Sequence, residues 1–309
     1  MSTTPLQTPA LHLVQDLRQI IQDARGRVAA QVNSELTLMY WHIGERINRD
    51  VLDNQRAEYG KQIVAAVSTQ LTWSHFIEIL PLKDDLQREF YITMAAAERW
   101  STRTLRDRID SMLYERTAIS SKPDELIHQE LANLRDNDVM TPELVFKSPY
   151  FLSFTGLTGM YSEKSLEDNL IVHLEQFLLE LGNGFTFVER QKRMIIDGED
   201  FYLDLLFYHR RLHRLIAIDL KLGKFKAQYK GQMELYLRWL EAHEMEQGEE
   251  TPLGLLLCTE GSSEQIELLQ LDKAGIQVAQ YLTELPSREL LQAQIQKSLA
   301  EARQRLGEE

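Results

Sequence analysis

Two aspartates and a lysine interrupt two apolar runs that otherwise have the composition of buried strands. Asp204 lies in "FYLDLLFYH" (201–209), and Asp219 and Lys221 lie in "RLIAIDLKLG" (214–223). Because successive residues of a strand point to opposite faces, Asp219 and Lys221 share a face. The segment from Asp204 to Asp219 has room for a strand, a short turn and a second strand, and adjacent strands lie about 5 Å apart. The sequence therefore predicts that the two carboxylates converge.

Converging carboxylates in an apolar setting repel each other unless a cation compensates them. A divalent metal such as Mg²⁺ takes oxygen ligands of this kind, and Lys221 could orient a water or stabilise charge on a phosphate. This is the equipment for metal-assisted hydrolysis of phosphodiesters. The spacing alone leaves a second interpretation open, in which Asp219 and Lys221 end a strand in solvent and Asp204 caps an edge.

Two helices should flank these strands. In "GQMELYLRWL" (231–240), Gln232 and Tyr236 are four residues apart and so share a helix face, which would pack back over the strand ends. In "LEDNLIVHL" (166–174), Glu167 comes at the start of an amphipathic helix. A third carboxylate on that helix could complete an oxygen site.

The chain divides into a helical first half and an alternating second half. Apolar residues at three- and four-residue spacing predict helices over most of residues 10–150. A region rich in Pro, Gly, Ser and Asp follows, and we place a domain boundary near residue 150. Residues 151–309 then predict the order α-β-β-β-α-β-α-β-α, which indicates an α/β fold with a mixed central sheet.

On these residues the second half resembles the PD-(D/E)xK nuclease fold, a restriction-endonuclease-like fold with an αβββαβ core. Its motif corresponds to Asp204 and to "DLK" at 219–221, and "QMELY" resembles the Q-x-x-x-Y motif of RecB-like members. The stretch 184–237 is similar to the YhcG-type nucleases, and the helical half resembles their winged-helix-like N-terminal module. The resemblance covers nearly the full chain.

The resemblance implies roles for these residues. Asp204 and Asp219 would be metal ligands together with the Leu220 carbonyl, and the metal would be Mg²⁺ or Mn²⁺. Lys221 would position the attacking water, and Gln232 would touch the site or the DNA. Glu167 would be the glutamate of the first helix, although Glu175, two turns on, fits nearly as well.

Two departures from the family pattern are visible. Leu203 precedes Asp204, where the proline of the classical motif would stand. The run "IVAAVSTQL" (63–71) continues directly into "TWSHFIEIL" (72–80), where relatives would have a few dozen more residues. We therefore expect a shortened N-terminal module.

The net charge of −13 argues against a protein that binds nucleic acid over its whole surface, but the charge is unevenly distributed. Residues 186–231 carry ten Lys or Arg against six Asp or Glu, whereas residues 241–309 carry five against fourteen. A basic strip suits a surface that faces phosphates, although scattered surface charge would look the same. The residues expected to contact DNA are Arg210, Arg211, Lys224, Lys226 and Tyr236.

Further features bound the setting of the protein. The single cysteine, Cys258, lies in an apolar run and is expected in the core rather than as a nucleophile. We find neither a secretory signal nor an apolar run long enough to span a membrane, so a cytoplasmic protein is expected.

Taken together, these features predict a Mg²⁺-dependent DNA endonuclease that acts in DNA repair, recombination or defence against mobile DNA. Two cuts in a duplex usually call for two sites, so a homodimer is a further possibility. One alternative is a non-catalytic DNA-binding or regulatory protein on the same scaffold. Another is a helical interaction protein whose sheet is only structural.

Overall fold

The structure is a computed structural model, which describes residues 71–260 and 264–307 and several helical positions between residues 19 and 39. Most of the helices predicted over 10–71 lie outside the described residues. The chain forms two compact units, Met1–Asp110 and Ser111–Glu309. Residues 111–150 thus belong to the second unit, and the domain boundary at residue 150 stays a prediction.

In the first unit the described residues form α3 (Trp73–Ile79), α4 (Asp85–Ala97) and α5 (Thr102–Asp110). Asp84 caps α4, because its side chain accepts a hydrogen bond from the Leu86 N–H at 3.0 Å. The buried side chains of Phe90, Tyr91 and Leu105 form part of the apolar interior of this unit. The winged-helix-like character of the N-terminal module stays a prediction.

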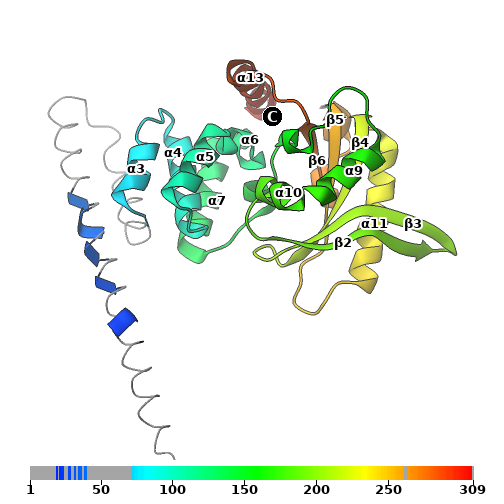
Figure 1. Ribbon diagram of the computed structural model, residues 1–309, viewed down its shortest axis with the longest axis horizontal. Coiled ribbons are helices and arrows are strands. Elements are labelled where there is room, and N and C mark those ends of the chain that lie inside the picture. The colour runs from blue at the N-terminus through cyan, green and yellow to red at the C-terminus, as the bar shows by residue number, and fades with distance from the viewer. Residues whose placement is uncertain are drawn as a thin grey trace, which may run out of the picture. The chain divides into compact units, whose positions relative to one another are not determined.

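The second unit contains a six-stranded mixed sheet in the order β1-β6-β5-β4-β3-β2 (Figure 1). Its strands are β1 (Tyr150–Phe151), β2 (Phe185–Ile196), β3 (Glu199–His209), β4 (Arg214–Lys224), β5 (Leu253–Glu260) and β6 (Ile276–Leu282). Strands β2, β3 and β4 pair antiparallel, whereas β4, β5, β6 and β1 pair parallel. The predicted mixed sheet is confirmed.

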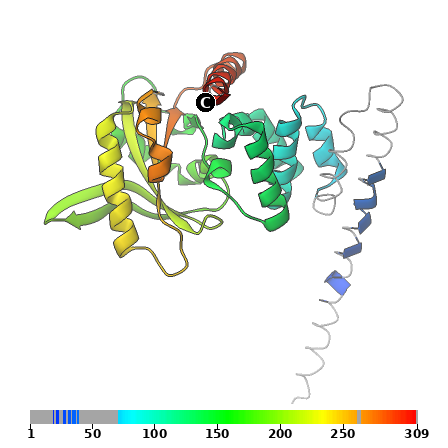
Figure 2. The same ribbon diagram turned by 180° about the vertical axis from the view of Figure 1, so that it is seen from behind.

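Helices cover both faces of this sheet. Helices α9 (Glu163–Val172) and α10 (Leu174–Leu181) lie on one face, and α11 (Ala227–His243) lies on the other, as the two opposite views show (Figures 1 and 2). The remaining helices of this unit are α6 (Leu113–Arg116), η1 (Ala118–Ser121), α7 (Asp124–Asn137), α8 (Pro142–Val145), η2 (Ser153–Thr155), α12 (Glu264–Leu268), η3 (Leu271–Ala274) and α13 (Arg288–Gly307). No helix among the described residues is long and apolar enough to cross a membrane.

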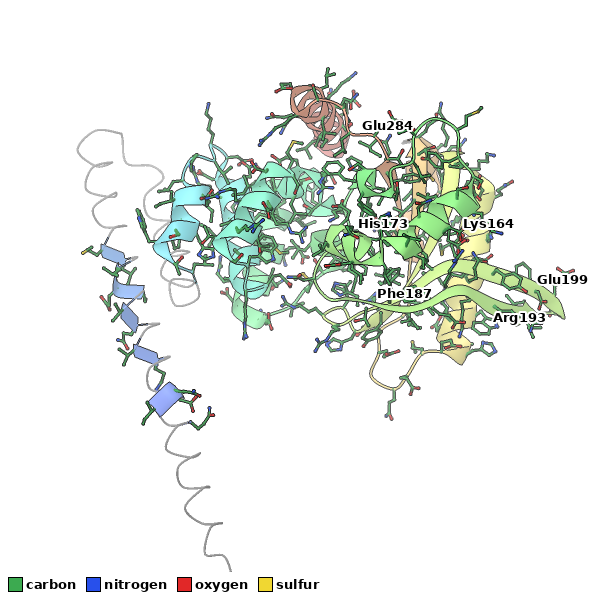
Figure 3. All side chains as sticks on the ribbon, in the orientation of Figure 1. Lys164, His173, Phe187, Arg193, Glu199 and Glu284 are labelled. Carbon is green, nitrogen blue, oxygen red and sulfur yellow. The ribbon has the colours of Figure 1, made fainter. Side chains whose placement is uncertain are left out.

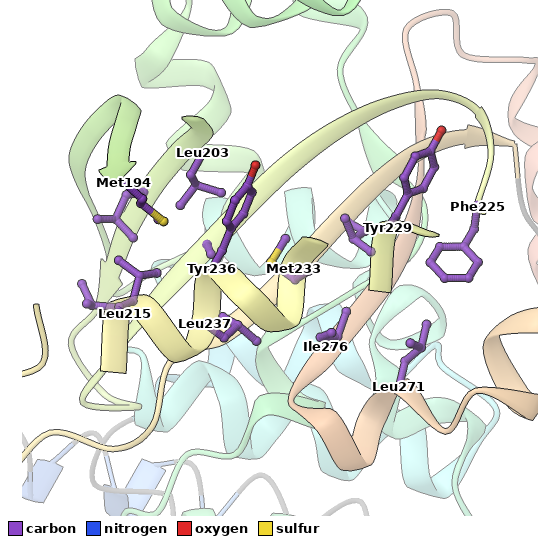
Figure 4. Packing of buried hydrophobic residues seen from close by; sticks show 14 of the residues in the cluster. Met194, Leu203, Leu215, Phe225, Tyr229, Met233, Tyr236, Leu237, Leu271 and Ile276 are labelled. Atoms are coloured by element: carbon purple, nitrogen blue, oxygen red, sulfur yellow. The ribbon is translucent and has the colours of Figure 1, made fainter. Parts of the chain in front are cut away.

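The core beneath α11 explains why this helix is held against the sheet. Met233, Tyr236 and Leu237 project from α11 onto side chains of the strands, among them Leu203 and Met194 (Figure 4). Gly254 of β5 leaves room for this contact, because a Cβ there would lie 2.6 Å from Cγ of Met233. Cys258 belongs to the same buried cluster, which confirms its placement in the core.

Two local features differ from the expectation. The single helix expected over 162–182 is broken at His173, whose φ of −108° and ψ of 36° leave the helical region. Strand β1 has only two residues, too few to produce an alternating pattern in the sequence. The breakpoint separates Glu167 on α9 from Glu175 on α10.

Candidate active site

Asp204 and Asp219 face each other at the point where β3 and β4 part. The strands pair from His209↔Arg214 to Leu205↔Ile218, and one further step in this register sets Asp204 opposite Asp219. The Leu220 N–H donates to Oδ2 of Asp204 at 2.8 Å. The Asp204 side chain therefore accepts a hydrogen bond that a backbone carbonyl of a neighbouring strand would otherwise accept. The predicted convergence of the two aspartates is present in the structure.

This position disfavours the charge of Asp204. Burial and the negative charge of Asp219 raise the pKa of Asp204 to about 7, while the Leu220 N–H and Lys221 act in the opposite direction. The two carboxyl groups therefore resist being ionised together. A bound cation would relieve this repulsion.

Lys221 stands beside Asp219, with Nζ 2.7 Å from Oδ2. Burial alone would lower the pKa of Lys221, but the charges of Asp219, Asp204 and Glu163 outweigh burial and raise it. The Lys221 side chain also lies near the Tyr229 ring, with Nζ 5.3 Å from its centre. In this arrangement Lys221 is an ammonium group that donates hydrogen bonds and does not act as a base.

Glu167 is buried, at 5% exposure, and both of its carboxylate oxygens have donors. Nε of Arg190 donates to Oε1, and Nε2 of Gln191 donates to Oε2 at 2.8 Å. The same Gln191 nitrogen donates to Oδ1 of Asp204 at 3.1 Å. An amide group thus lies between Glu167 and Asp204.

The structure separates the two glutamates considered for the helix position. Glu175 is exposed in the first turn of α10, whereas Glu167 is buried and contacts residues of β2. Glu163 also reaches the site region, because its Oε1 accepts the Leu222 N–H at 3.0 Å. Glu163 was not singled out in the sequence, where it is one of several acidic residues at a helix start.

Gln232 and Tyr236 contact each other on α11, where Nε2 of Gln232 donates to the Tyr236 hydroxyl at 2.6 Å. That hydroxyl donates to the Tyr202 carbonyl of β3 at 3.2 Å. Tyr236 is only 1% exposed, and burial raises the pKa of its hydroxyl. Tyr236 therefore joins α11 to β3, and its predicted contact with DNA stays a prediction.

The basic residues predicted to bind DNA fall into two groups. Lys224 and Lys226 are exposed and follow Lys221 at the end of β4. Arg210 and Arg211 lie in the turn between β3 and β4, six residues or roughly 20 Å along the strand from Asp204. Arg211 is ion-paired with Asp138. Only the lysine pair lies on the side of the candidate site.

The donor set suits a hard divalent cation. Asp204 and Asp219 supply carboxylate oxygens, and burial together with the charge of Asp219 raises the pKa of Asp204, so a cation beside the pair would favour its ionised form. Among the residues that the structure describes, no group of three His, Cys, Asp or Glu side chains is arranged to hold a metal ion. The predicted trio of Glu167, Asp204 and Asp219 is therefore not gathered around one point, and the fit rests on the two aspartates.

Gln191 is a further residue of this cluster that the sequence did not reveal. It lies in "FTFVERQKRMII", where a polar residue among charged neighbours on a strand gives no distinctive pattern. The only available signal was its position in the strand next to the one that carries Asp204.

Two family models match the chain. The family described as the YhcG PDDEXK nuclease domain matches residues 143–299, and the DUF1016 N-terminal domain matches residues 16–72 and 63–116. The two segments matched by the DUF1016 domain overlap at residues 63–72, close to the place where residues were expected to be missing. The shortened module stays a prediction.

"Putative nuclease YhcG" of Escherichia coli (strain K12) is 35% identical over 240 residues, which are 77% of this chain and 63% of that protein. The chain therefore spans less than two thirds of the length of this curated relative.

Two solved structures are similar to part of the chain. A repair endonuclease from Pyrococcus abyssi is 19% identical with a TM-score of 0.29, covering 42% of this chain and 50% of that one. An EndoMS–dsDNA complex is 15% identical with a TM-score of 0.31, covering 42% and 48%.

The order of elements from α9 to β5, together with the family match over 143–299, confirms the restriction-endonuclease-like fold. This chain belongs to the YhcG PDDEXK nuclease domain family.

Proposed function

We propose that the chain hydrolyses phosphodiester bonds in DNA as an endonuclease that requires Mg²⁺ or Mn²⁺. One observation carries the proposal: Asp204 and Asp219 oppose each other where β3 and β4 part, with the Lys221 ammonium 2.7 Å from Asp219. Family membership supports the same reaction class.

Each side chain has a defined task in this proposal. Asp204 and Asp219 would hold the cation, with the Leu220 carbonyl as the ligand that the family resemblance implies. When bound, the cation supplies an acidified water and positive charge at the phosphate. Lys221, charged and anchored by Asp219, orients the attacking water and donates to a non-bridging phosphate oxygen. The expected product carries a 5′-phosphate.

The surroundings of the site suit a DNA strand. Lys224 and Lys226 are exposed beyond Lys221 and can contact phosphates on either side of the scissile bond. The hairpin of β2 and β3 continues past Asp204, with Arg193 and Glu199 close to its tip (Figure 3). We propose a role in repair, recombination or defence against mobile DNA, with the helical module recruiting DNA or a partner.

The test is cleavage of a panel of labelled single-stranded, nicked, branched and duplex DNAs in Mg²⁺ and in Mn²⁺. Wild type should cut at least one substrate, and cutting should stop when EDTA is added. Asp204→Asn and Lys221→Gln should lower the rate at least about 100-fold, as loss of groups that stabilise a transition state does. Glu241→Gln, in the last turn of α11 and ion-paired with Arg238, is the matched control. Wild-type cutting by both site variants would refute the proposed roles.

A further inference from the structure

Gln191 lies directly opposite Asp204 on the neighbouring strand. Arg190 pairs with Leu205 and Lys192 pairs with Leu203, so the register sets Gln191 against Asp204. A primary amide nitrogen carries two hydrogens, and the contacts of Gln191 account for both. One is donated to Oε2 of Glu167 at 2.8 Å and the other to Oδ1 of Asp204 at 3.1 Å.

The backbone of Gln191 is unusual for a residue in a strand. Its φ is +50°, in the left-handed region that glycine adopts readily and residues with a side chain disfavour. Such conformations persist where the surrounding structure enforces them, and they gather at functional sites. The two hydrogen bonds of the Gln191 side-chain amide help to hold the residue in this conformation.

The contacts form a continuous link from α9 to β4. Arg190 holds one oxygen of Glu167 and Gln191 holds the other. Gln191 also holds one oxygen of Asp204, and the Leu220 N–H holds the second at 2.8 Å. Each oxygen of Asp204 therefore has one donor, and its carboxylate has a fixed orientation toward Asp219.

We propose that Gln191 is a positioning residue that orients Asp204 for the cation, and that Glu167 is the anchor of Gln191 and not itself a metal ligand. This inference rests on the proposed function. Residues that hold a metal ligand in place typically change metal affinity 10- to 100-fold when they are lost. If Gln191 were purely structural, its loss would change the stability of the protein and leave its metal affinity unchanged.

Two variants separate these roles. Gln191→Ala and Gln191→Gly both lack the amide, so both should bind Mn²⁺ about tenfold more weakly than wild type. Glycine tolerates the positive φ, so Gln191→Gly should have the higher midpoint of thermal unfolding of the two. If the two variants lose the same Mn²⁺ affinity but differ in stability, the missing amide causes the loss of affinity and a change in folding does not.

Glu167 is tested in the same way. Glu167→Gln keeps an oxygen that can accept from Gln191, so it should lose less Mn²⁺ affinity than Asp204→Asn. A Glu167 that ligated the metal directly would instead behave like Asp204. Gln277→Ala, on β6 and two strands away from β4, is the control and should bind as wild type does.

The measurement is calorimetric titration of the full chain with Mn²⁺, with thermal unfolding of each variant in parallel. If both Gln191 variants bind Mn²⁺ as tightly as wild type, the inference is overturned while the proposed function stands. The inference also fails if Glu167→Gln abolishes binding as Asp204→Asn does. If wild type and Asp204→Asn bind Mn²⁺ alike, or neither binds, the proposed function fails and takes this inference with it.

Discussion

The surroundings of Asp204 bring its pKa close to neutral pH. Its pKa is raised to about 7, first by burial and then by the charge of Asp219. A group whose pKa is higher in the folded state stabilises the fold below its unfolded pKa, and that contribution is lost as the pH rises through the folded value. At pH 8 the metal-free protein should therefore lack this stabilisation.

Replacing Asp204 with asparagine should relieve the repulsion. At pH 8 in EDTA we expect Asp204→Asn to be more stable than wild type by about 1–2 kcal/mol, because one of two facing carboxylates becomes neutral. Thermal unfolding measures this difference. Adding Mn²⁺ should then raise the midpoint of wild type but not that of the variant, and a lower midpoint for the variant in EDTA would contradict the electrostatic account.

His209, at the end of β3, should make stability depend on pH in the opposite direction. Burial lowers its pKa to about 4, and Nδ1 accepts the Leu212 N–H at 3.1 Å, a hydrogen bond that protonation of Nδ1 would break. The unfolded chain binds this proton near pH 6.5 and the folded chain does not, so stability is lost as the pH falls from about 6.5 to 4.

The expected loss from His209 is on the order of 2–3 kcal/mol across this window, measured by urea unfolding at several pH values. His209→Phe should remove this part of the slope. His213→Asn, at an exposed position whose positive φ asparagine tolerates, should leave the slope as in wild type. An unchanged slope in His209→Phe would show that other groups cause it.

The residue types and their two-residue spacing predicted the meeting of Asp204, Asp219 and Lys221, because strand geometry converts spacing into a shared face, but spacing alone also allowed a strand end in solvent. Gln191 could not be predicted in this way. Its contacts depend on a left-handed backbone within a strand and on the approach of α9, and neither leaves a periodic signal in the sequence.

At the scale of elements, the site exists because β3 leaves β4 before either strand ends. Beyond Leu205 the carbonyl groups of β3 on that side need other partners, and the Tyr236 hydroxyl of α11 supplies one to Tyr202. The order of strands and helices was predictable from alternation and length. The parting of β3 and β4 was not, because it is set by tertiary packing, as is the break at His173.

Removing the Tyr236 hydroxyl tests this support. Tyr236→Phe keeps the ring packed but leaves the Tyr202 carbonyl and Gln232 without their partner, which should destabilise the protein by about 1–2 kcal/mol. Gln232→Leu leaves the Tyr236–Tyr202 hydrogen bond intact and should cost less stability. Urea unfolding compares the two, and equal or reversed losses would contradict the role given to Tyr236.

At the scale of the whole molecule, charge distribution matters more than net charge. The chain carries −13 overall, yet Lys224 and Lys226 are exposed beside the site, while Arg210 lies at the other end of the β3–β4 hairpin. The sequence identified the basic strip but could not separate the basic residues near the site from those far from it. The distance of each one from Asp204 depends on the register of the strands, which the sequence does not give.

DNA binding should depend on salt through the lysine pair. Lys224→Ala with Lys226→Ala should weaken binding and reduce the slope of log K against log salt by about 1–2, since each lost phosphate contact removes about one released counterion. Arg210→Ala is the matched control and should leave the slope nearly unchanged. Fluorescence anisotropy across a salt series, with Ca²⁺ in place of Mg²⁺, measures both, and a larger effect from Arg210 would place the DNA elsewhere.

The most direct test of hydrolysis at the paired aspartates is an end-labelled cleavage assay with Asp219→Asn, which alters the group that anchors Lys221 and faces Asp204. We predict that wild type cuts DNA only with Mg²⁺ or Mn²⁺ and leaves 5′-phosphate ends, and that Asp219→Asn is at least about 100-fold slower while remaining folded. Cutting by Asp219→Asn at the wild-type rate, with the same metal requirement and the same ends, would contradict the account.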